Sequence, residues 1–275
     1  MTTEPLLDSG QLNYGSYLHL DELLNAQHPA SSPAHHDELL FIVQHQTTEL
    51  WLKLMIHELR SACERFAADD PATALKRLAR VKHIQDTMTQ QWSVLATLTP
   101  SEYSEFRGTL GTSSGFQSYQ YRVLEFLLGN KNAGLLQVFD KQPAAHAAVK
   151  EALESPTLYD QFLRWAARHG LAVPREILDR DVTQPYRLNE ALIDVFAGVY
   201  DNPDEHWAIY ETCEELVDLE DNFQLWRFRH LRTVQRTIGM GTGTGGSAGV
   251  KFLERALSIT FFPELFEVRT RISAL

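Results

Sequence analysis

Apolar residues recur at three- and four-residue steps along most of this chain, which is the period of an amphipathic α-helix. The pattern predicts long helices over residues 36–67, 71–98 and 205–238, with a further helix that begins after residue 115. Shorter helices are predicted at about 144–153, 157–169, 188–200, 250–260 and 262–273. No alternating strand pattern, internal repeat or Pro/Ser-rich linker interrupts the series. The sequence therefore predicts one all-α domain spanning residues 1–275.

Local signals mark where some of these helices begin. Ser31-Ser32-Pro33 is a break before the first long helix, and Pro100 or Ser101 can open the helix that follows residues 71–98. The run from His35 to Glu38 has side chains that can bind a metal. We interpret this run instead as the polar start of a helix, where acidic side chains are favoured.

Composition narrows the classes of partner. Hydrophobic residues make up 44% of the chain, enough for a sizeable core, and the net charge of −11 argues against nucleic acid or an acidic membrane surface. No apolar run approaches the roughly 20 residues that span a bilayer. The first ten residues lack the basic start of a signal peptide. Two cysteines far apart fit neither a disulfide framework nor a zinc motif, so we expect a cytoplasmic protein.

The stretch from Gly239 to Gly249, GMGTGTGGSAG, matches the dinucleotide fingerprint G-x-G-x-x-G in its spacing. That fingerprint requires a strand before it, and the preceding segment has a helical period instead. A phosphate loop would also need a lysine before Ser247. Two interpretations remain from the residues alone: a flexible connection between helices, or a loop that closes over a ligand.

Two histidines lie on apolar helix faces. One predicted face comprises Leu216, Leu219, Phe223, Trp226, His230 and Val234, with most of the neighbouring acids and arginines, Arg227 among them, off that face. The other comprises Phe41, His45, Thr48 and Leu52. A lone histidine in such a place is usually a core residue. Two of them, each one turn from an aromatic residue, favour a haem with one axial ligand and one open face.

Other metal sites fit the sequence less well. No histidine has a glutamate three residues before it, as a carboxylate-bridged di-iron bundle would need. His57-Glu58 lacks the second histidine of a zinc protease motif. A separate pair, Tyr103 and Arg107, shares one helix face and could hold a carboxylate, since a guanidinium matches that group with two hydrogen bonds.

Several long motifs resemble one known family. HDELLFIVQHQTTELWLKL, YSEFRGTLGTSSGFQSYQYR, EELVDLEDNFQLWRFRHLRTVQRTIG, GTGGSAGVKFL and the N-terminal LNYGSYLHLDELLNAQ are similar to the bacterial tryptophan 2,3-dioxygenase family, over about residues 11–270. The resemblance implies an all-helical fold, a haem b cofactor and a homotetramer made of paired dimers. It also implies an enzyme that opens the indole ring of L-tryptophan with O2 to give N-formyl-L-kynurenine, the first step of oxidative tryptophan degradation.

The resemblance also implies roles for single residues. His230 would be the axial haem ligand, and His45 would hydrogen-bond the indole N–H on the opposite side. We expect His45 to orient the substrate and not to act as an obligate base, because an indole N–H is far too weak an acid. Arg107 with Tyr103 would hold the substrate carboxylate, and Thr244 would meet its ammonium group.

Further residues would complete the pocket. Phe41 would pack on the indole, and Ser114 and Gly115 would line the pocket near the oxygen. By the same resemblance, residues 239–249 would be the mobile loop that orders over bound tryptophan. Residues 1–10 are expected to be disordered, while residues 11–30 would reach a neighbouring subunit. The arm residues that would enter the neighbour's site are Tyr14, Tyr17 and Leu18.

Three rival interpretations stay open from the sequence. The first is a haem dioxygenase for another indole derivative. The second is a haem-binding sensor or storage protein without turnover, which would have no need for Arg107 with Thr244. The third is a helical interaction protein whose histidines belong to the core.

Overall fold

The computed structural model of the protein describes residues 12–241, 243 and 249–273. Within these ranges every regular element is an α-helix or a short 3₁₀ helix, and no strand is present, so the all-α prediction is confirmed. The α-helices are α1 (Tyr14–Leu18), α2 (Leu20–Leu24), α3 (Glu38–Ala67), α4 (Pro71–Leu95), α5 (Pro100–Arg107), α6 (Tyr119–Leu128), α7 (Pro143–Glu154), α8 (Leu158–Arg168), α9 (Arg175–Leu178), α10 (Glu190–Asp201), α11 (Trp207–Ile238), α12 (Val250–Ala256) and α13 (Pro263–Glu267). The 3₁₀ helices are η1 (Gly108–Leu110), η2 (Gly115–Gln117), η3 (Ala133–Phe139) and η4 (Val268–Thr270).

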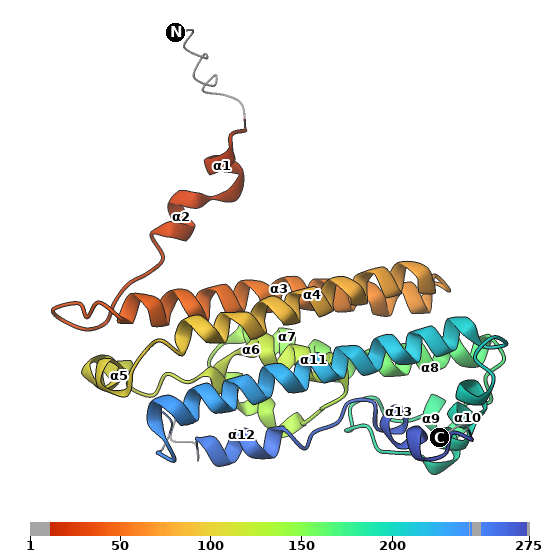
Figure 1. The fold of residues 1–275 in the computed structure, drawn as a ribbon. Helices are drawn as coiled ribbons and strands as arrows, with labels where there is room; N and C mark the ends of the chain where they lie inside the picture. Colours follow the sequence, from red (N-terminus) through yellow and green to blue (C-terminus); the bar gives the residue numbers. More distant parts are fainter. Residues whose placement is uncertain (1–11, 242, 244–248, 274–275) are drawn as a thin grey trace, which may run out of the picture.

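Three long helices form the central layer of the fold. α4 packs against both α3 and α11, and Figure 1 shows that α3 runs in one direction while α4 and α11 run in the other. The beginning of α3 and the ends of α4 and α11 therefore lie at the same end of the molecule, next to α5. Side chains from four separate helices can meet at this end.

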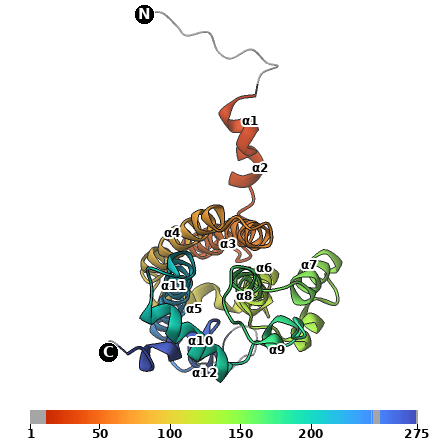
Figure 2. The ribbon, with the colours of Figure 1, turned by 90° about the vertical axis from the view of Figure 1, so that its right-hand side faces the viewer.

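A second group of helices covers the other side of α3. α6 and α8 both pack against α3, and α7 lies outside α6, as the end-on view in Figure 2 shows. α10 and α13 pack together at the opposite end from α5. This second group supports α3 without reaching the end where α5 lies.

Local capping explains the helix boundaries around α5. The side chain of Thr99 accepts a hydrogen bond from the Glu102 N–H, and Pro100 occupies the first helical position. The predicted start at Pro100 is thus confirmed. The helix predicted for 71–98 ends earlier, at Leu95, because the residues up to Thr99 form the turn that leads into this cap.

Two side chains lie differently from the predicted pattern. Arg227, predicted off the apolar face of its helix, is only 3% exposed because it pairs with the buried Glu125 at 3.1 Å and donates to the Ile259 carbonyl at 3.2 Å. Leu39, predicted on the apolar face of its helix, is 49% exposed. A charged residue is thus buried through its partners, and an apolar one is left on the surface.

The first described residues form an arm that leaves the body of the subunit. Figures 1 and 2 show α1 and α2 projecting away from α3, and neither helix contains a buried residue. Residues 1–10, predicted to be disordered, lie outside the described part of the chain. The arm gains almost no stability from its own subunit.

Two further predictions concern the polar run at the start of α3, at residues 35–38, and the two cysteines. Asp37 is the N-cap position of α3 and Glu38 lies in its first turn, and the described residues contain no metal-binding cluster of His, Cys, Asp and Glu. Cys63 and Cys213 are both free thiols. None of the described helices has the length and apolar character to cross a membrane.

Candidate active site

The two predicted histidines come from different helices and lie within electrostatic reach of one another. His45 lies in the first third of α3 and His230 in the last third of α11, and these parts of the two helices point towards the end of the molecule where α5 lies. Burial, together with a smaller contribution from the nearby His45, lowers the pKa of His230 to about 4. The fold therefore brings together two imidazoles that are 185 positions apart in the chain, as residues 45 and 230.

The surroundings of His230 are aromatic. Its ring stacks on Trp92 of α4 with 4.6 Å between centroids and 7° between planes, and Trp226 lies one turn away at 5.5 Å. Among the described residues none forms a hydrogen bond with the His230 ring. With a pKa of about 4 the imidazole is neutral at neutral pH, so a nitrogen lone pair is available to a metal.

His45 has its tautomer fixed by the backbone. Its Nδ1 lies 2.7 Å from the Phe41 carbonyl oxygen, which can only accept, so Nδ1 carries the proton and Nε2 keeps its lone pair. Burial lowers the pKa of His45, although the Phe41 hydrogen bond and the charge of Glu49 oppose that shift. His45 therefore presents a neutral acceptor nitrogen.

Both imidazoles keep some accessible surface. His45 is exposed and His230 is half-buried, yet burial is the largest cause of the lowered pKa of each. Aromatic rings contact both histidines: Phe41 lies against His45, and Trp92 and Trp226 lie against His230.

α5 adds a charged and aromatic wall to the same region. The Phe41 ring lies 4.2 Å from the His45 ring, 5.9 Å from Tyr103 and 5.7 Å from Phe106. The Arg107 guanidinium carbon is 6.0 Å from the Tyr103 ring centroid. Burial raises the pKa of Tyr103, so its hydroxyl keeps its proton and remains a donor. Four predicted site residues thus meet in one cluster: Phe41, His45, Tyr103 and Arg107.

Ser114 and Gly115 lie in the turn between α5 and α6. Ser114 caps η2, where its hydroxyl accepts from the Phe116 N–H at 3.3 Å, and a Cβ added to Gly115 would meet nothing within 4 Å. Phe116 packs edge-on against Phe252 of α12 at 5.6 Å. These contacts place the turn against α12.

The glycine stretch connects α11 to α12. It follows a helix and not a strand, which agrees with the rejection of a dinucleotide loop. Gly249 has a φ of 52°, and a Cβ there would lie 2.6 Å from the Gly241 carbonyl oxygen. Glycine is needed at this position for both reasons, and the two ends of the stretch meet there. Thr244, predicted to meet the substrate ammonium, lies outside the described residues.

The predicted residues of the arm do not join the site of their own subunit. Tyr14 is 76% exposed, Tyr17 is 68% exposed and Leu18 is 39% exposed. All three belong to α1, which projects from the body. If they line a substrate pocket, that pocket belongs to another copy of the chain.

Sequence reasoning missed two aromatic residues at this site, Trp92 and Phe106. The apolar spacing of α4, with Val81, Met88, Trp92 and Leu95 all buried, shows that Trp92 faces inwards. Spacing along one helix does not show which residue of another helix it meets. Its indole Nε1 is buried without a hydrogen-bond partner, which is a signal only the folded chain provides.

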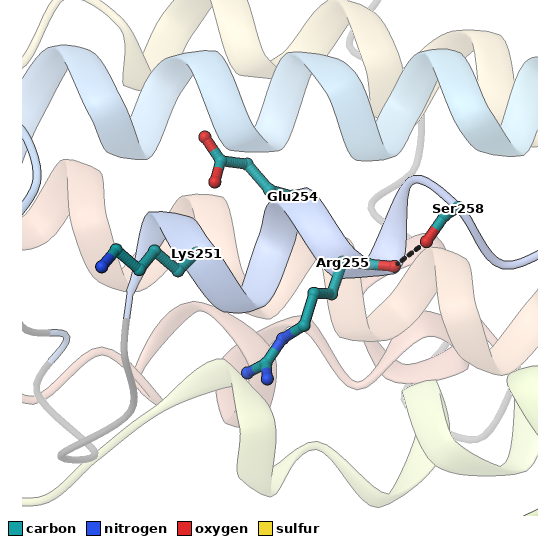
Figure 3. Close-up of a pocket in the computed structure, with 4 residues that line it drawn as sticks. All are labelled: Lys251, Glu254, Arg255 and Ser258. Carbon is teal, nitrogen blue, oxygen red and sulfur yellow. Dashed lines mark hydrogen bonds between the residues drawn. The ribbon is translucent and has the colours of Figure 1, made fainter.

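Two hollows elsewhere in the described chain lack these features. One of about 560 Å³ is lined by Lys251, Glu254, Arg255 and Ser258, all from the region of α12. Figure 3 shows the first three side chains pointing in different directions, so they do not converge on a ligand. An internal cavity beside Trp226 measures about 10 Å³ and is apolar, which is too small for a cofactor.

The residues around the two histidines suit a haem. The His230 imidazole is neutral, has no hydrogen bond to the described residues and stacks against an indole, and the surrounding rings are apolar. The second imidazole, His45, is held by the Phe41 carbonyl. These features fit His230 to hold a haem iron.

The fold and the site define a class: a helical protein with a neutral imidazole that can bind a metal, a second oriented imidazole and an arginine–tyrosine pair, as expected of a haem enzyme for an aromatic substrate that carries a carboxylate. Comparison with known proteins gives the family. The family model for tryptophan 2,3-dioxygenase matches residues 2–199 and 191–272.

Curated relatives agree with this match. The chain is 64% identical over 264 residues to tryptophan 2,3-dioxygenase of Kineococcus radiotolerans, covering 96% of this chain and 92% of the relative. It is also 64% identical over 264 residues to the enzyme of that name from Rhodococcus jostii, covering 96% and 93%. The relative of the same name in Serratia proteamaculans is 58% identical over 266 residues, covering 97% and 95%. The chain belongs to the tryptophan 2,3-dioxygenase family.

Proposed function

We propose that this protein is a haem-dependent dioxygenase that inserts both atoms of O2 across the indole C2–C3 bond of L-tryptophan. The product is N-formyl-L-kynurenine, and the reaction is the first step of tryptophan degradation by the kynurenine pathway. The observation that carries the proposal is the meeting of His45, Tyr103 and Arg107 with Phe41 at the end of the fold where His230 lies, in a member of this family.

His230 holds the cofactor in this proposal. When bound, ferrous haem b supplies the iron that binds and activates dioxygen. The neutral imidazole of His230 would hold the iron, and the stacked Trp92 ring limits rotation of that imidazole about its side-chain bonds. The aromatic lining keeps the site apolar, which strengthens every hydrogen bond made within it.

Three groups bind and orient the substrate. Arg107 and Tyr103 bind the carboxylate, since the guanidinium forks onto both oxygens and the tyrosine hydroxyl donates a third bond. Phe41 packs against the indole ring. The Nε2 lone pair of His45 accepts the indole N–H, and this orients the C2–C3 bond without removing the proton.

Two predicted contributions concern loops. Ser114 and Gly115 line the pocket near the oxygen, supported by the open space beside Gly115. Residues 239–249 close over bound tryptophan, exclude water and bring Thr244 to the ammonium group. The support within the described chain is that the two ends of this stretch meet at Gly241 and Gly249, which suits a loop that moves as one unit.

The protein assembles as a homotetramer of paired dimers, in which the arm lines the neighbour's site through Tyr14, Tyr17 and Leu18. Support comes from the exposure of these three residues and from the lack of any buried residue in α1 or α2. Large exposed apolar side chains on a projecting segment indicate a surface that a second molecule covers. The proposal places the enzyme in the cytoplasm.

The decisive experiment is an assay of product formation. We expect reduced, aerobic protein to convert L-tryptophan to a kynurenine-type product, followed by its ultraviolet absorbance, with one O2 consumed per product. Tryptamine lacks the carboxylate and D-tryptophan exchanges two substituents, so both should react far more slowly. Equal rates on tryptamine would favour a dioxygenase for another indole.

The remaining rivals predict different results in the same assay. A haem sensor or storage protein would show a Soret band but no product. A helical interaction protein would purify without colour. Either result would overturn the proposed function.

A further inference from the structure

The segment between the arm and the body is folded against α3 by two polar side chains. We define the root as residues 26–31, which join α2 to the turn before α3. Glu38 in the first turn of α3 and Gln46, two turns further on, each hydrogen-bond to this root. Both positions flank Phe41 and His45 on the same helix.

Glu38 makes the denser set of contacts. One carboxylate oxygen accepts from the Ala30 N–H at 2.6 Å, and the other accepts from the Ser31 N–H at 3.1 Å and from the Ser31 hydroxyl. The Ser31 hydroxyl oxygen in turn accepts from the His35 N–H at 2.9 Å. Glu38 is only 1% exposed, so these donors have little access to water if the carboxylate is removed.

Gln46 holds the other end of the root. Its Nε2 donates to the Ala26 carbonyl at 2.9 Å, and its Oε1 accepts from Gln27 Nε2 at 2.6 Å. The side chain of Gln27 also donates to the Leu23 carbonyl, the second-last residue of α2. Gln46 is therefore connected through Gln27 to the last turn of α2, which belongs to the arm.

We propose that Glu38, assisted by Gln46, is a positioning residue that acts in trans: it fixes the direction in which the arm leaves, and so completes the substrate site of a second copy of the chain. This inference rests on the proposed entry of Tyr14 and Tyr17 into the neighbour's pocket. A segment that docks on another subunit loses less conformational freedom when its path is already fixed. The root supplies that fixed path.

The position of Glu38 explains why a change there should affect the substrate site of a second copy of the chain. Glu38 contacts the chain that leads away from its own subunit, and the arm beyond the root has no buried residue in that subunit. A defect in the root therefore leaves the pocket on the same chain with its own Phe41, Tyr103 and Arg107. The loss falls on the copy that receives the arm.

The first variant to test is Glu38→Gln, which keeps the shape of the side chain. Either orientation of the amide turns its NH2 towards a backbone N–H, so at least one buried donor loses its partner. We expect KM for L-tryptophan to rise by roughly tenfold, as one lost hydrogen bond of this kind predicts. Deuterium exchange should increase at the amides of residues 14–24 and stay unchanged at residues 50–66. Glu64→Gln, an exposed glutamate of the same helix, is the matched control and should change neither quantity.

The direct test of action in trans is a mixed assembly. Glu38→Gln and Arg107→Ala chains, each with its own affinity tag, are co-expressed, and assemblies carrying both tags are isolated. A mixed pair contains one complete pocket, because the Glu38→Gln chain has an intact pocket and receives the well-placed arm of the Arg107→Ala chain. We expect activity several times the mean of the two parent proteins. Activity equal to that mean would overturn the inference.

An arm deletion separates this inference from the proposed function. Chains lacking residues 1–25, mixed with Arg107→Ala chains, test only whether arms are exchanged. One outcome would overturn the role of the root and still support arm exchange. In it, activity recovers when the deletion chain is mixed with Arg107→Ala chains, but does not recover when Glu38→Gln or Gln46→Ala chains are used in place of the deletion chain. If no mixture recovers activity, both the inference and the exchanged arm are wrong.

Discussion

The two histidines of the site show how one type of side chain is prepared for two tasks. His230 makes no hydrogen bond to the described residues and lies flat against Trp92, so its orientation comes from ring packing. His45 is held by a single hydrogen bond to the Phe41 carbonyl, so its orientation and its tautomer come from the backbone. The first arrangement leaves a lone pair that suits a metal, and the second leaves an acceptor that suits an N–H donor, as the proposed function requires.

The largest effect in this comparison is expected from His230→Ala. Without the axial nitrogen the protein should purify with little haem and no measurable turnover, while its far-ultraviolet circular dichroism stays unchanged. The Soret absorbance relative to the protein absorbance measures the loss. His169→Ala is the matched control, because that imidazole also packs against a tryptophan, Trp165, with 4.9 Å between the ring centroids. Retention of haem through an unchanged axial bond in His230→Ala would refute the assignment.

The next largest effect concerns the side of the site that α5 forms. We expect Arg107→Ala to raise KM for L-tryptophan by roughly a hundredfold, since truncating one partner of a buried charge pair costs about 2–5 kcal/mol. Haem content should remain normal. Steady-state kinetics with tryptamine provide the control, because a substrate without a carboxylate should be affected little. An unchanged KM for L-tryptophan would exclude the carboxylate clamp.

A smaller effect is expected from His45→Ala. Turnover should fall by roughly ten- to a hundredfold without being abolished, because the lost hydrogen bond orients the indole and carries no proton transfer. Burial holds the pKa of His45 below its ordinary value of 6.5. As pH falls, kcat/KM should therefore stay level to about 6.5 and decline only below it, and this decline should be missing in His45→Ala. Complete loss of turnover with haem and substrate still bound would argue for an obligate base.

The smallest effect is expected from Trp92→Phe. A phenyl ring can still stack on His230, and the change also removes the buried indole N–H that lacks a partner. We expect haem to be retained and the free energy of unfolding to fall by about 1 kcal/mol. Trp92→Leu, which removes the stacking, should lower the haem content and should lower the free energy of unfolding more than Trp92→Phe does. Equal behaviour of the two variants, measured by the Soret maximum and thermal unfolding, would show that ring stacking does not orient His230.

Much of the fold follows from the sequence because its helices are long and strongly periodic. The start of α5 at Pro100 is confirmed by its cap, and α3 and α11 begin within two residues of their predicted positions at 36 and 205. The single turn α9 and the 3₁₀ helix η3 were not predicted, because elements this short carry no period of their own. Arg227 was misplaced because its burial depends on Glu125 of another helix.

In the site, too, contacts within one helix could be predicted from the sequence and contacts between helices could not. Spacing places Phe41 beside His45, and Trp226 beside His230, since each pair is four residues apart on one helix. The meeting of Phe41 with Tyr103 and of His230 with Trp92 joins different helices and needed the fold. The roles of Ser114, Gly115, Thr244 and the arm residues stay predictions of the family resemblance.

The projecting arm has a consequence for how substitutions act. Since α1 and α2 bury nothing in their own subunit, changes there leave the folding equilibrium of a single chain almost untouched. In the proposed assembly their effect would be felt when chains associate. Variation in this segment would then be constrained by fit to a sister molecule, whereas variation in α3 or α11 is constrained first by whether the chain folds.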